Sequence, residues 1–371
     1  KPGGMIAVAE PDYIDWPETE MDEIASKGLQ QTRVDDVDGA ENSPARYLLN
    51  RLPEAINTAA ESPIRMLFVS GTNPVYGMSD TQAVVKAFEK IPLVVSFSSY
   101  MDETAAQADL IIPNHIYIEL YEDVPFDRGF PKRILGLTQP VVDPLHNTRH
   151  TGEVIIQLAK EMGGTVAKAF SWDSYQGCLE DTLEDLPSLQ EKGFQVDDAV
   201  TSSNWAEAFG TDSAQFEFSN NRIDALPEYT PPVAQGDESF YQLLLVPYDS
   251  MRLASGYVGS PPFLVKALED SILKGNDVLV EINPATAKKL GLSNGQYATL
   301  STPIASGRVK VYFFDGIMPG VVAIPRGLGH TGDNKFLAGK GLNYNALCAP
   351  VEDPASGLDA AWGIRAKLAK V

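Results

Sequence analysis

Short apolar runs alternate with helix-like segments between residues 64 and 113. Ile64–Ser70, Leu93–Phe97 and Ala108–Ile112 are each apolar over the length of a buried strand. Between the first two runs, Ser79–Lys90 begins with capping residues and then carries apolar residues at helical spacing. Buried strands that alternate with helices predict a parallel sheet, so we expect a Rossmann-like α/β domain here.

Residues 152–235 continue this domain with helices and a linker. Gly152–Gly164 predicts an amphipathic helix that ends at a glycine pair. Residues 165–235 mix weak helices with an acidic linker that contains proline and ends near Pro231-Pro232. We therefore expect a domain boundary there, with residues 1–235 as the α/β domain and residues 236–371 as a second domain. The apolar side of the helix is predicted to carry Val154, Ile155, Leu158 and Met162.

The second domain is rich in short strands separated by Gly, Pro and Asn. One helix among them has clear ends: Asn283 suits the N-cap, Pro284 the first turn, and Gly291 the C-terminal end. Many short strands around one or two helices predict a small closed β-barrel. The expected strands are Tyr241–Val246, Asp277–Ile282, Tyr297–Ser301, Gly307–Phe313 and Gly320–Ile324.

The amino-acid composition argues against several classes of function. The 371 residues are 44% hydrophobic, and the formal net charge of −21 argues against a nucleic-acid or anionic-membrane surface. The two cysteines, Cys178 and Cys348, and the four histidines show no metal-ligand spacing, so we expect no metal site and no iron–sulfur cluster in this segment. No apolar run approaches the roughly 20 residues that a membrane-spanning helix needs. The opening residues, Lys1–Met5, lead us to expect part of a longer polypeptide.

Two polar loops follow strands of the predicted sheet. Gly71, Thr72 and Asn73 come directly after the first strand, where ligands bind in open α/β sheets, although a plain strand-to-helix turn explains them as well. A second group follows the next strand, and its acids also suit a helix N-terminus without any ligand. This second group consists of Ser98, Asp102, Glu103 and Thr104.

A third loop region lies in the barrel domain. Pro325–Gly332 and Gly339–Asn345 combine dense glycine with four polar residues: Arg326, His330, Asn343 and Asn345. Such loops suit a flat polar ligand, and a flexible barrel rim is the alternative. A lone histidine gives no nucleophile–base pair, so no catalytic residue is identified in the chain.

Taken in series, these segments resemble the dimethyl sulfoxide reductase family of molybdopterin oxidoreductases. The matching pieces are Arg65–Pro74, Asp102–Pro113 followed by Glu119, Gly152–Gly164, Glu281–Gly291 and Pro319–Val322. The resemblance implies a Rossmann-like α/β domain followed by a double-psi-type β-barrel. It also implies that the chain is the C-terminal half of a subunit whose N-terminal half supplies the metal ligand and the electron-entry cluster.

In that family the two domains grip molybdopterin guanine dinucleotide. By resemblance, the first domain would hold a nucleotide end near Gly71–Asn73 and Ser98–Thr104. The barrel would close over the pterins with Arg252 and the region that contains Gly327, His330 and Asn343.

The chain also departs from the family pattern. Ser98 stands where an Asp commonly recognises guanine, and Gly256–Leu264 has fewer polar side chains than the family usually has after Arg252. Four segments resemble the molybdoenzyme-like subunits of membrane quinone complexes, namely the quinone reductase complex of sulfate reducers and alternative complex III. They are Ser96–Ala105, Asn114-His115, Gly329–Thr331 and Ala338–Gly341. The resemblance implies that these subunits have lost the molybdenum cofactor and act as scaffolds.

Three hypotheses follow. In the first, the chain belongs to a quinone-linked respiratory subunit with a degenerate cofactor site, which is periplasmic, is attached to the membrane through its partners and lies beside iron–sulfur and cytochrome subunits. In the second, it is half of an active molybdenum reductase of the polysulfide or thiosulfate type. In the third, it is a free-standing nucleotide-binding protein. The sequence leaves open whether the subunit is itself an enzyme.

Overall fold

The structure of the chain is a computed structural model. It describes residues 13–14, 20–37, 46–126, 132–197, 211, 213, 215, 234–253, 263–333, 335–353, 356–361 and 363–371. The chain divides into two compact units, one formed by residues 1–31 and 112–228 and the other by residues 32–111 and 229–371. The larger unit thus joins the first predicted sheet to the barrel, because loops of residues 71–104 bond to barrel loops. The domain boundary at residue 235 stays a prediction.

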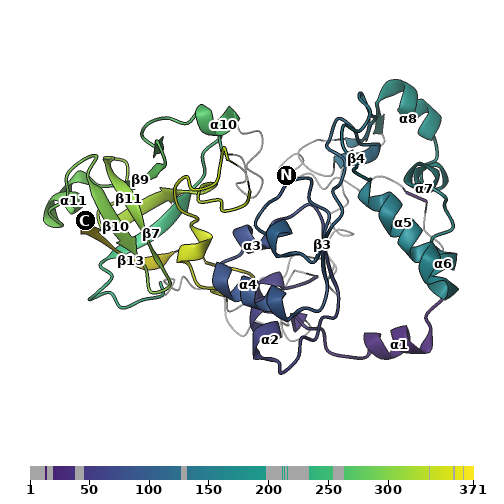
Figure 1. The fold of residues 1–371 in the computed structure, drawn as a ribbon, viewed down its shortest axis with the longest axis horizontal. Helices are drawn as coiled ribbons and strands as arrows, with labels where there is room; N and C mark the ends of the chain where they lie inside the picture. The colour runs from purple at the N-terminus through teal and green to yellow at the C-terminus, as the bar shows by residue number, and fades with distance from the viewer. Residues whose placement is uncertain are drawn as a thin grey trace. The chain divides into compact units, whose positions relative to one another are not determined.

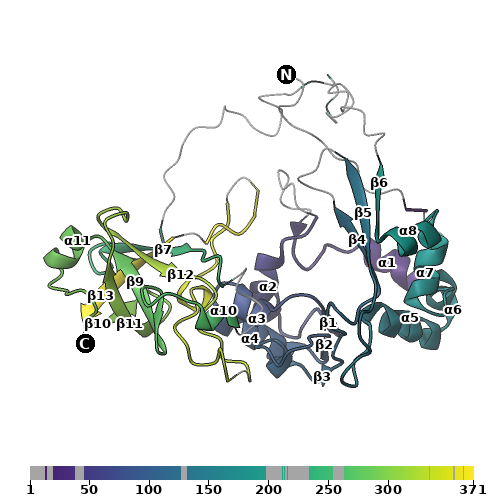
Figure 2. The same cartoon turned by 90° about the horizontal axis from the view of Figure 1, so that it is seen from above.

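The larger unit begins with a parallel sheet, as the sequence predicts. Its three strands lie in the order β1-β2-β3, with parallel pairing on both sides of β2. Figure 1 shows the helices α2, α3 and α4 of this part close together, and Figure 2 labels the three strands next to one another. The strands are β1 Leu67–Val69, β2 Val94–Ser96 and β3 Leu110–Ile111. The helices of this part are η2 Leu49–Arg51, α2 Leu52–Thr58, α3 Pro74–Gly77, α4 Thr81–Lys90 and η3 Ala105–Gln107.

The helix predicted at Ser79–Lys90 forms as α4. Asp80 is its N-cap, with φ of 52°, and the carboxylate accepts a hydrogen bond from the Ala83 N–H. Val84, Ala87 and Phe88 are buried and pack with Val69 and Val94 of the sheet. The apolar stripe of α4 therefore fixes this helix on one face of β1 and β2.

The second part of the larger unit is a closed six-stranded β-barrel, as predicted. The strands follow the order β11-β10-β13-β7-β12-β9, and pairing of β11 with β9 closes the ring; β8 extends beyond β9. The strands are β7 Leu243–Tyr248, β8 Leu273–Lys274, β9 Asp277–Ile282, β10 Tyr297–Ser301, β11 Ser306–Phe313, β12 Val321–Pro325 and β13 Ile364–Lys370. The short helices here are α10 Phe263–Lys266, α11 Pro284–Lys289 and η4 Asn345–Leu347.

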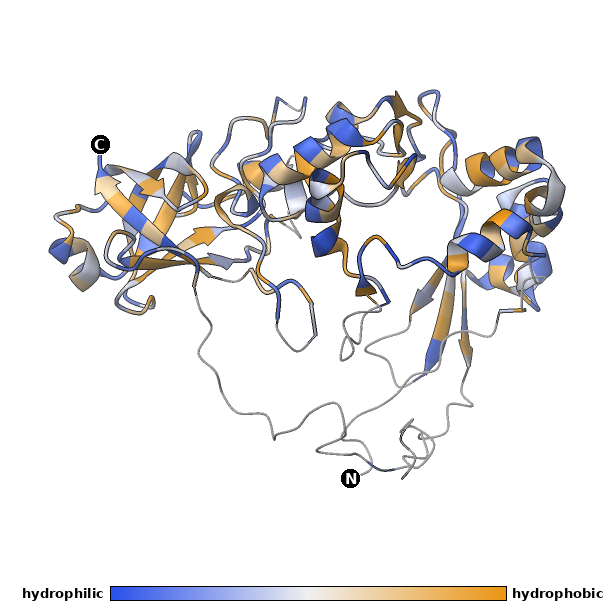
Figure 3. Ribbon diagram, turned by 90° about the horizontal axis from the view of Figure 1, so that it is seen from below, coloured by the Kyte–Doolittle hydropathy of each residue, from blue (hydrophilic) through white to orange (hydrophobic). Residues whose placement is uncertain are grey.

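The barrel interior is filled by aliphatic side chains. Leu245, Val280, Ile282, Leu300 and Val309 are fully buried there. Hydrophobic and hydrophilic residues are interleaved along the barrel strands (Figure 3), as expected for strands with one face toward a core. The ends of α11 follow the sequence: the Asn283 side chain accepts from the Ala285 N–H, and Gly291, with φ of 70°, ends the helix.

The smaller unit is an antiparallel sheet accompanied by helices. The sheet has the order β4-β5-β6, and the hydrophobic pattern did not predict it. The strands are β4 Glu122–Phe126, β5 Arg133–Thr138 and β6 Phe194–Asp197. The helices are α1 Glu23–Leu29, α5 Thr151–Met162, α6 Gly164–Ala169, α7 Tyr175–Thr182 and α8 Leu186–Lys192.

Helix α5 forms where it was predicted, but its buried side is different. Leu158 and Met162 are 39% and 66% exposed, whereas Ile156 and Ala159 are buried. Ile156 packs with Trp172 and Cys178, which lie on following segments that the helix pattern did not include.

Several predicted features lie outside the described residues. They are Lys1–Met5, Pro231-Pro232 and nearly all of Gly256–Leu264. Within the described residues, no helix is long and apolar enough to cross a membrane.

Shortening a barrel core side chain tests this packing. Leu245 is fully buried on β7, so Leu245→Ala should lower the free energy of unfolding by about 2–5 kcal/mol through lost burial and a cavity. The control Val371→Ala changes a side chain that is 73% exposed and should stay within about 0.5 kcal/mol. Denaturant unfolding followed by circular dichroism measures both; equal effects would contradict the barrel assignment.

Candidate functional site

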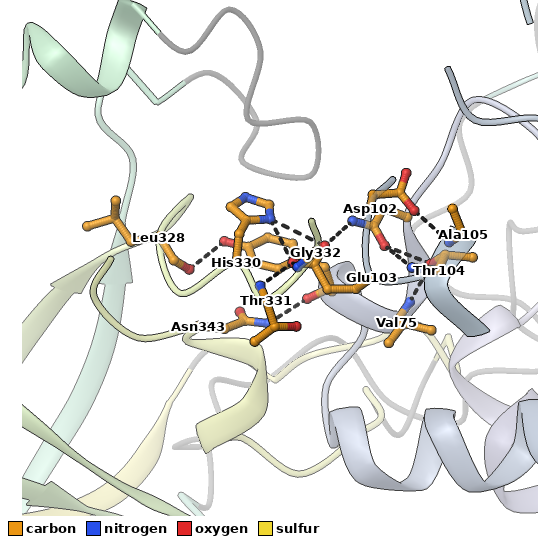
Figure 4. Close-up of polar contacts among 12 residues, drawn as sticks. Val75, Asp102, Glu103, Thr104, Ala105, Leu328, His330, Thr331, Gly332 and Asn343 are labelled. Atoms are coloured by element: carbon orange, nitrogen blue, oxygen red, sulfur yellow. Dashed lines mark hydrogen bonds and ion pairs between the residues drawn. The ribbon is translucent and has the colours of Figure 1, made fainter. Parts of the chain in front are cut away.

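The carboxylate of Glu103 is the centre of the candidate site. It accepts hydrogen bonds from the Asn73 amide at 2.7 Å, the Thr331 N–H at 2.6 Å and the Gly332 N–H at 3.1 Å. The His330 Nδ1 lies 3.1 and 3.3 Å from its two oxygens. Figure 4 shows these contacts between the loop of residues 102–105 and the barrel loop of residues 328–332. We call these residues the Glu103 cluster.

The cluster is buried and charged. The side chain of Glu103 is 7% exposed and that of His330 is 6% exposed. Burial by itself raises the pKa of Glu103, but the hydrogen bonds from His330, Asn73 and the Gly332 N–H outweigh it and hold the pKa at about 2. Glu103 is therefore an anion at neutral pH, and its charge is balanced by donors of the chain itself.

An aromatic stack supports His330 from one side. The His330 and Tyr76 rings lie 3.9 Å apart at an interplanar angle of 7°. The Tyr76 hydroxyl donates to the Leu328 carbonyl at 2.8 Å, and burial together with the nearby Glu103 charge raises the pKa of Tyr76. The side-chain amides of Asn343 and Asn345 both donate to the Tyr76 carbonyl, at 2.9 and 3.1 Å. Helix α3 is thus bonded to the barrel loops through Tyr76.

Two glycines allow this close approach. A Cβ on Gly329, whose φ is +80°, would lie 2.0 Å from the Asn343 nitrogen. A Cβ on Gly332 would lie 2.6 Å from the Met101 carbonyl oxygen. The backbones of the two loops approach so closely that no side chain fits between them. The contact within the chain therefore explains why this loop has glycine at these positions.

Other predicted site residues also take part in local bonding. The Thr104 hydroxyl donates to the Asn73 side-chain oxygen at 2.7 Å and accepts from the Val75 N–H at 3.1 Å. The Ser98 hydroxyl donates to Asp102 at 2.7 Å, and Asp102 accepts from the Ala105 N–H at 2.7 Å. Asp102 therefore binds the first N–H of the short helix η3, whose N-cap residue is Thr104.

Four further predicted residues, Gly71, Thr72, Gly327 and Arg252, have the following surroundings. Gly71 has φ of +65° with open space where a Cβ would be, and Gly327 has φ of +95°. Thr72 lines an apolar cavity next to β1. Arg252 donates to the Ala267 carbonyl at 2.6 Å and lies 3.4 Å from the Glu269 carboxylate.

A cavity of about 460 Å³ lies between α4 and the barrel loops. This volume falls within the range of about 300–1,000 Å³ that is usual for small-molecule sites. Two carboxyl side chains, Asp80 and Glu103, line it with neutral hydroxyl and amide groups, and its described lining includes no lysine or arginine. The nearby Arg326 is held by two 2.8 Å bonds to Asp249.

These lining groups do not fit a pyrophosphate-bearing dinucleotide. A pyrophosphate needs cations or free N–H donors, whereas this lining adds the negative charge of Glu103. The Thr331 and Gly332 N–H groups, which are suited to an anion, already bind that carboxylate. Within the described residues, no group of three or more His, Cys, Asp or Glu side chains is placed to hold a metal ion.

The sequence did not identify every residue of this cluster. Tyr76, which supports His330, has no role in the sequence analysis, although an aromatic residue two positions after the Gly-Thr-Asn-Pro turn was the available signal. Glu103 was read as either a ligand-binding or a capping residue. In the structure its side chain accepts from the Thr331 N–H, and it is Asp102 that bonds the Ala105 N–H at the start of η3. The ligand-binding role of Glu103 stays a prediction.

Comparison with known proteins gives two family matches. Residues 40–161 match the molybdopterin oxidoreductase family, and residues 266–362 match the molydopterin dinucleotide binding domain. The chain is 30% identical over 311 residues to the menaquinone reductase molybdopterin-binding-like subunit of Nitratidesulfovibrio vulgaris, covering 84% of this chain and 42% of that protein. It is 23% identical to the thiosulfate reductase molybdopterin-containing subunit of Salmonella typhimurium, covering 80% of this chain and 42% of that protein.

A solved structure supports the fold. Acetylene hydratase from Pelobacter acetylenicus superposes with a TM-score of 0.72 at 20% sequence identity, covering 92% of this chain and 50% of that one. The α/β sheet followed by a closed barrel is therefore an arrangement known in a solved protein. The chain spans half or less of the length of these relatives.

Neutralising Glu103 tests the charge of the cluster. Its folded pKa of about 2 lies below the ordinary value of 4.5, so its stabilisation is present above about pH 4.5 and is lost as the pH falls toward 2. Glu103→Gln should therefore lower the free energy of unfolding by about 2–3 kcal/mol at pH 7, and the difference from wild type should shrink toward pH 3. Denaturant titrations at several pH values measure this; a pH-independent difference would contradict the role of the charge.

A pair of glycine variants tests the loop contact. Gly329→Ala adds a Cβ against the backbone and should cost about 3 kcal/mol or more. Gly339→Ala is the matched control, since its φ of +72° is similar but no atom lies within 4 Å of the added Cβ. That control should lose only about 1–2 kcal/mol. Equal losses would show that the loop does not press on residues 342–343.

Proposed function

Because the chain belongs to the molybdopterin oxidoreductase family, we propose that it is the C-terminal half of a subunit in a quinone-linked respiratory complex. Its role there is largely structural, and its cofactor site is degenerate. The family membership and the subunit name of the Nitratidesulfovibrio relative support this placement. The site residues named from the sequence keep their cofactor-binding role as a prediction.

The Glu103 cluster carries this proposal. In a subunit that binds the dinucleotide, polar groups at the edge of the sheet and on the barrel loop should be available to the ligand. Here Asn73, Glu103 and the Thr331 N–H instead satisfy one another within the chain. The same bonds join the α/β part to the barrel directly, as expected for a subunit with a structural role.

The proposal extends to partners and location. The similar proteins are named as subunits of reductases, so we place the chain beside an N-terminal half, iron–sulfur subunits and cytochrome or membrane subunits. The complex would lie on the periplasmic side and reach the membrane through those partners. In such a complex, electrons travel through the partner subunits and not through this chain.

A second candidate is an active molybdenum reductase of the polysulfide or thiosulfate type. One observation favours it: Gly71 has a positive φ and open space around its Cβ position, so a phosphate or ribose has access to the backbone at the carboxyl end of β1. In that case, bis-molybdopterin guanine dinucleotide would be bound mainly by residues outside the Glu103 cluster, and the other half of the protein would supply the metal ligand.

Metal analysis of the intact complex distinguishes the structural subunit from the active molybdenum reductase. The complex is purified under native conditions, molybdenum and tungsten are measured by mass spectrometry, and pterin is extracted and quantified. The scaffold role predicts well under one-tenth of a metal atom per subunit and no dinucleotide. One metal atom and two dinucleotides per subunit would overturn it in favour of the reductase. A purified molybdenum reductase processed in parallel serves as the recovery control.

A further inference from the structure

In the smaller unit, the loop between β5 and α5 exposes large apolar side chains to solvent. The loop is bonded to an earlier turn of the chain, because the Val141 N–H donates to the Ile118 carbonyl at 3.0 Å. A group of large apolar side chains that all face solvent is uncommon on a protein surface and marks a contact site. The loop and the turn together carry four such side chains, which we call the Leu145 patch: Tyr117, Val141, Val142 and Leu145, exposed by 77%, 75%, 46% and 81%.

Hydrogen bonds hold this loop in a defined shape. The buried carboxylate of Glu119 accepts from the Leu145 N–H at 2.9 Å and from the Ile116 N–H at 3.2 Å. Further along the loop, the Thr148 hydroxyl lies 2.7 Å from the His115 Nδ1. The backbone that carries the apolar side chains is therefore already ordered, and a partner that binds them has little loop entropy to remove.

The unit that carries the Leu145 patch is strongly acidic. Residues 1–31 and 112–228 contain 27 Asp and Glu against 10 Lys and Arg, a formal net charge of −17. The rest of the chain contains 23 against 19, a formal net charge of only −4.

This charge decides which kind of partner suits the patch. Four exposed apolar side chains by themselves suit either a lipid surface or an apolar cleft in a protein. An acidic unit repels the anionic lipids of a membrane surface. It attracts a basic protein, over a distance that ions limit to about 10 Å at 0.1 M salt. The charge therefore favours a basic protein as the partner.

We infer that the Leu145 patch is the docking site for another subunit of the complex, one whose contact surface is an apolar cleft bordered by lysine and arginine. Leu145 and Tyr117 enter the cleft, and the exposed Asp143, which follows Val142 in the loop, faces its basic border. A tyrosine that is removed from water at the centre of an interface contributes more to binding than most residues do. The acids of the unit speed the approach of this partner and disfavour acidic ones.

The inference rests on the proposed function in one respect, namely that the chain belongs to a complex of several subunits. It does not depend on whether the complex holds a cofactor. A metal-loaded complex in which Leu145 contacts a basic subunit would overturn the structural role alone. A metal-free complex in which Leu145 contacts no other subunit would overturn the docking site alone.

Photo-cross-linking within the intact complex tests the docking site. The variant Leu145→p-benzoylphenylalanine is made in the full-length subunit, the complex is purified and irradiated, and the linked peptides are identified by mass spectrometry. We expect one main product, formed with a segment of another subunit that is rich in lysine and arginine. The same change at Met318, which is 72% exposed on the barrel, is the control and should give at least about tenfold less of that product.

Several outcomes would overturn the docking site. They are cross-links from Leu145 to the other half of its own subunit, to a second copy of this chain or to an acidic segment, and the absence of any cross-link. Flotation of the full-length subunit with vesicles of phosphatidylglycerol and phosphatidylethanolamine tests the lipid alternative. Flotation that Leu145→Asp abolishes and Met318→Asp preserves would identify the patch as a membrane contact instead.

The same two aspartate variants in the full-length subunit provide a second measurement. Leu145→Asp places a charge in the proposed apolar contact, whereas Met318→Asp changes a side chain of similar exposure on the barrel. We expect Leu145→Asp to lower the yield of assembled complex several-fold and Met318→Asp to leave it near wild type. Both variants should leave the melting temperature of the subunit nearly unchanged, because both side chains are exposed. Equal yields for the two variants would contradict the inference.

Discussion

The carboxylate of Glu103 is the interaction on which the larger unit depends. A buried carboxylate is stable only when hydrogen-bond donors replace the water that it has lost. Here the donors come from Asn73 on the sheet side and from residues 330–332 on the barrel side, 227 residues away for His330. Removing the acceptor would leave several buried N–H groups without partners, so the two parts are joined by one charge and not by apolar area alone.

This arrangement explains why the chain matches a cofactor-binding family and yet has a lining ill suited to a dinucleotide. Family motifs at Gly71–Pro74 and Asp102–Ala105 specify a turn, a cap and a carboxylate in a fixed geometry. The same geometry serves a contact between the sheet and the barrel. The presence of these family motifs therefore does not by itself indicate cofactor binding, because the same residues form hydrogen bonds that hold this chain together.

The parts of the fold that the sequence predicted are those fixed by local pattern. Strands β9 and β10 begin and end where their apolar runs do, and α4 begins at its capping aspartate. Strand β13 was missed because Arg365 and Lys367 mask the alternation of Ile364, Ala366 and Leu368. The orientation of the Glu103 side chain could not be predicted from the sequence either. Its partners lie far along the chain, and adjacent acids give no local sign of which one turns inward.

The place of β13 in the barrel has a consequence for synthesis. This strand, Ile364–Lys370, lies between β10 and β7, so the ring cannot close until residues 364–370 have left the ribosome. At about 5–20 residues per second, the segment that contains Glu103 waits for tens of seconds before its barrel partners are in place. During that time the Glu103 carboxylate lacks the donors of residues 330–332. The buried charge of Glu103 therefore exchanges water for its protein donors only late in folding, after the barrel strands have been made.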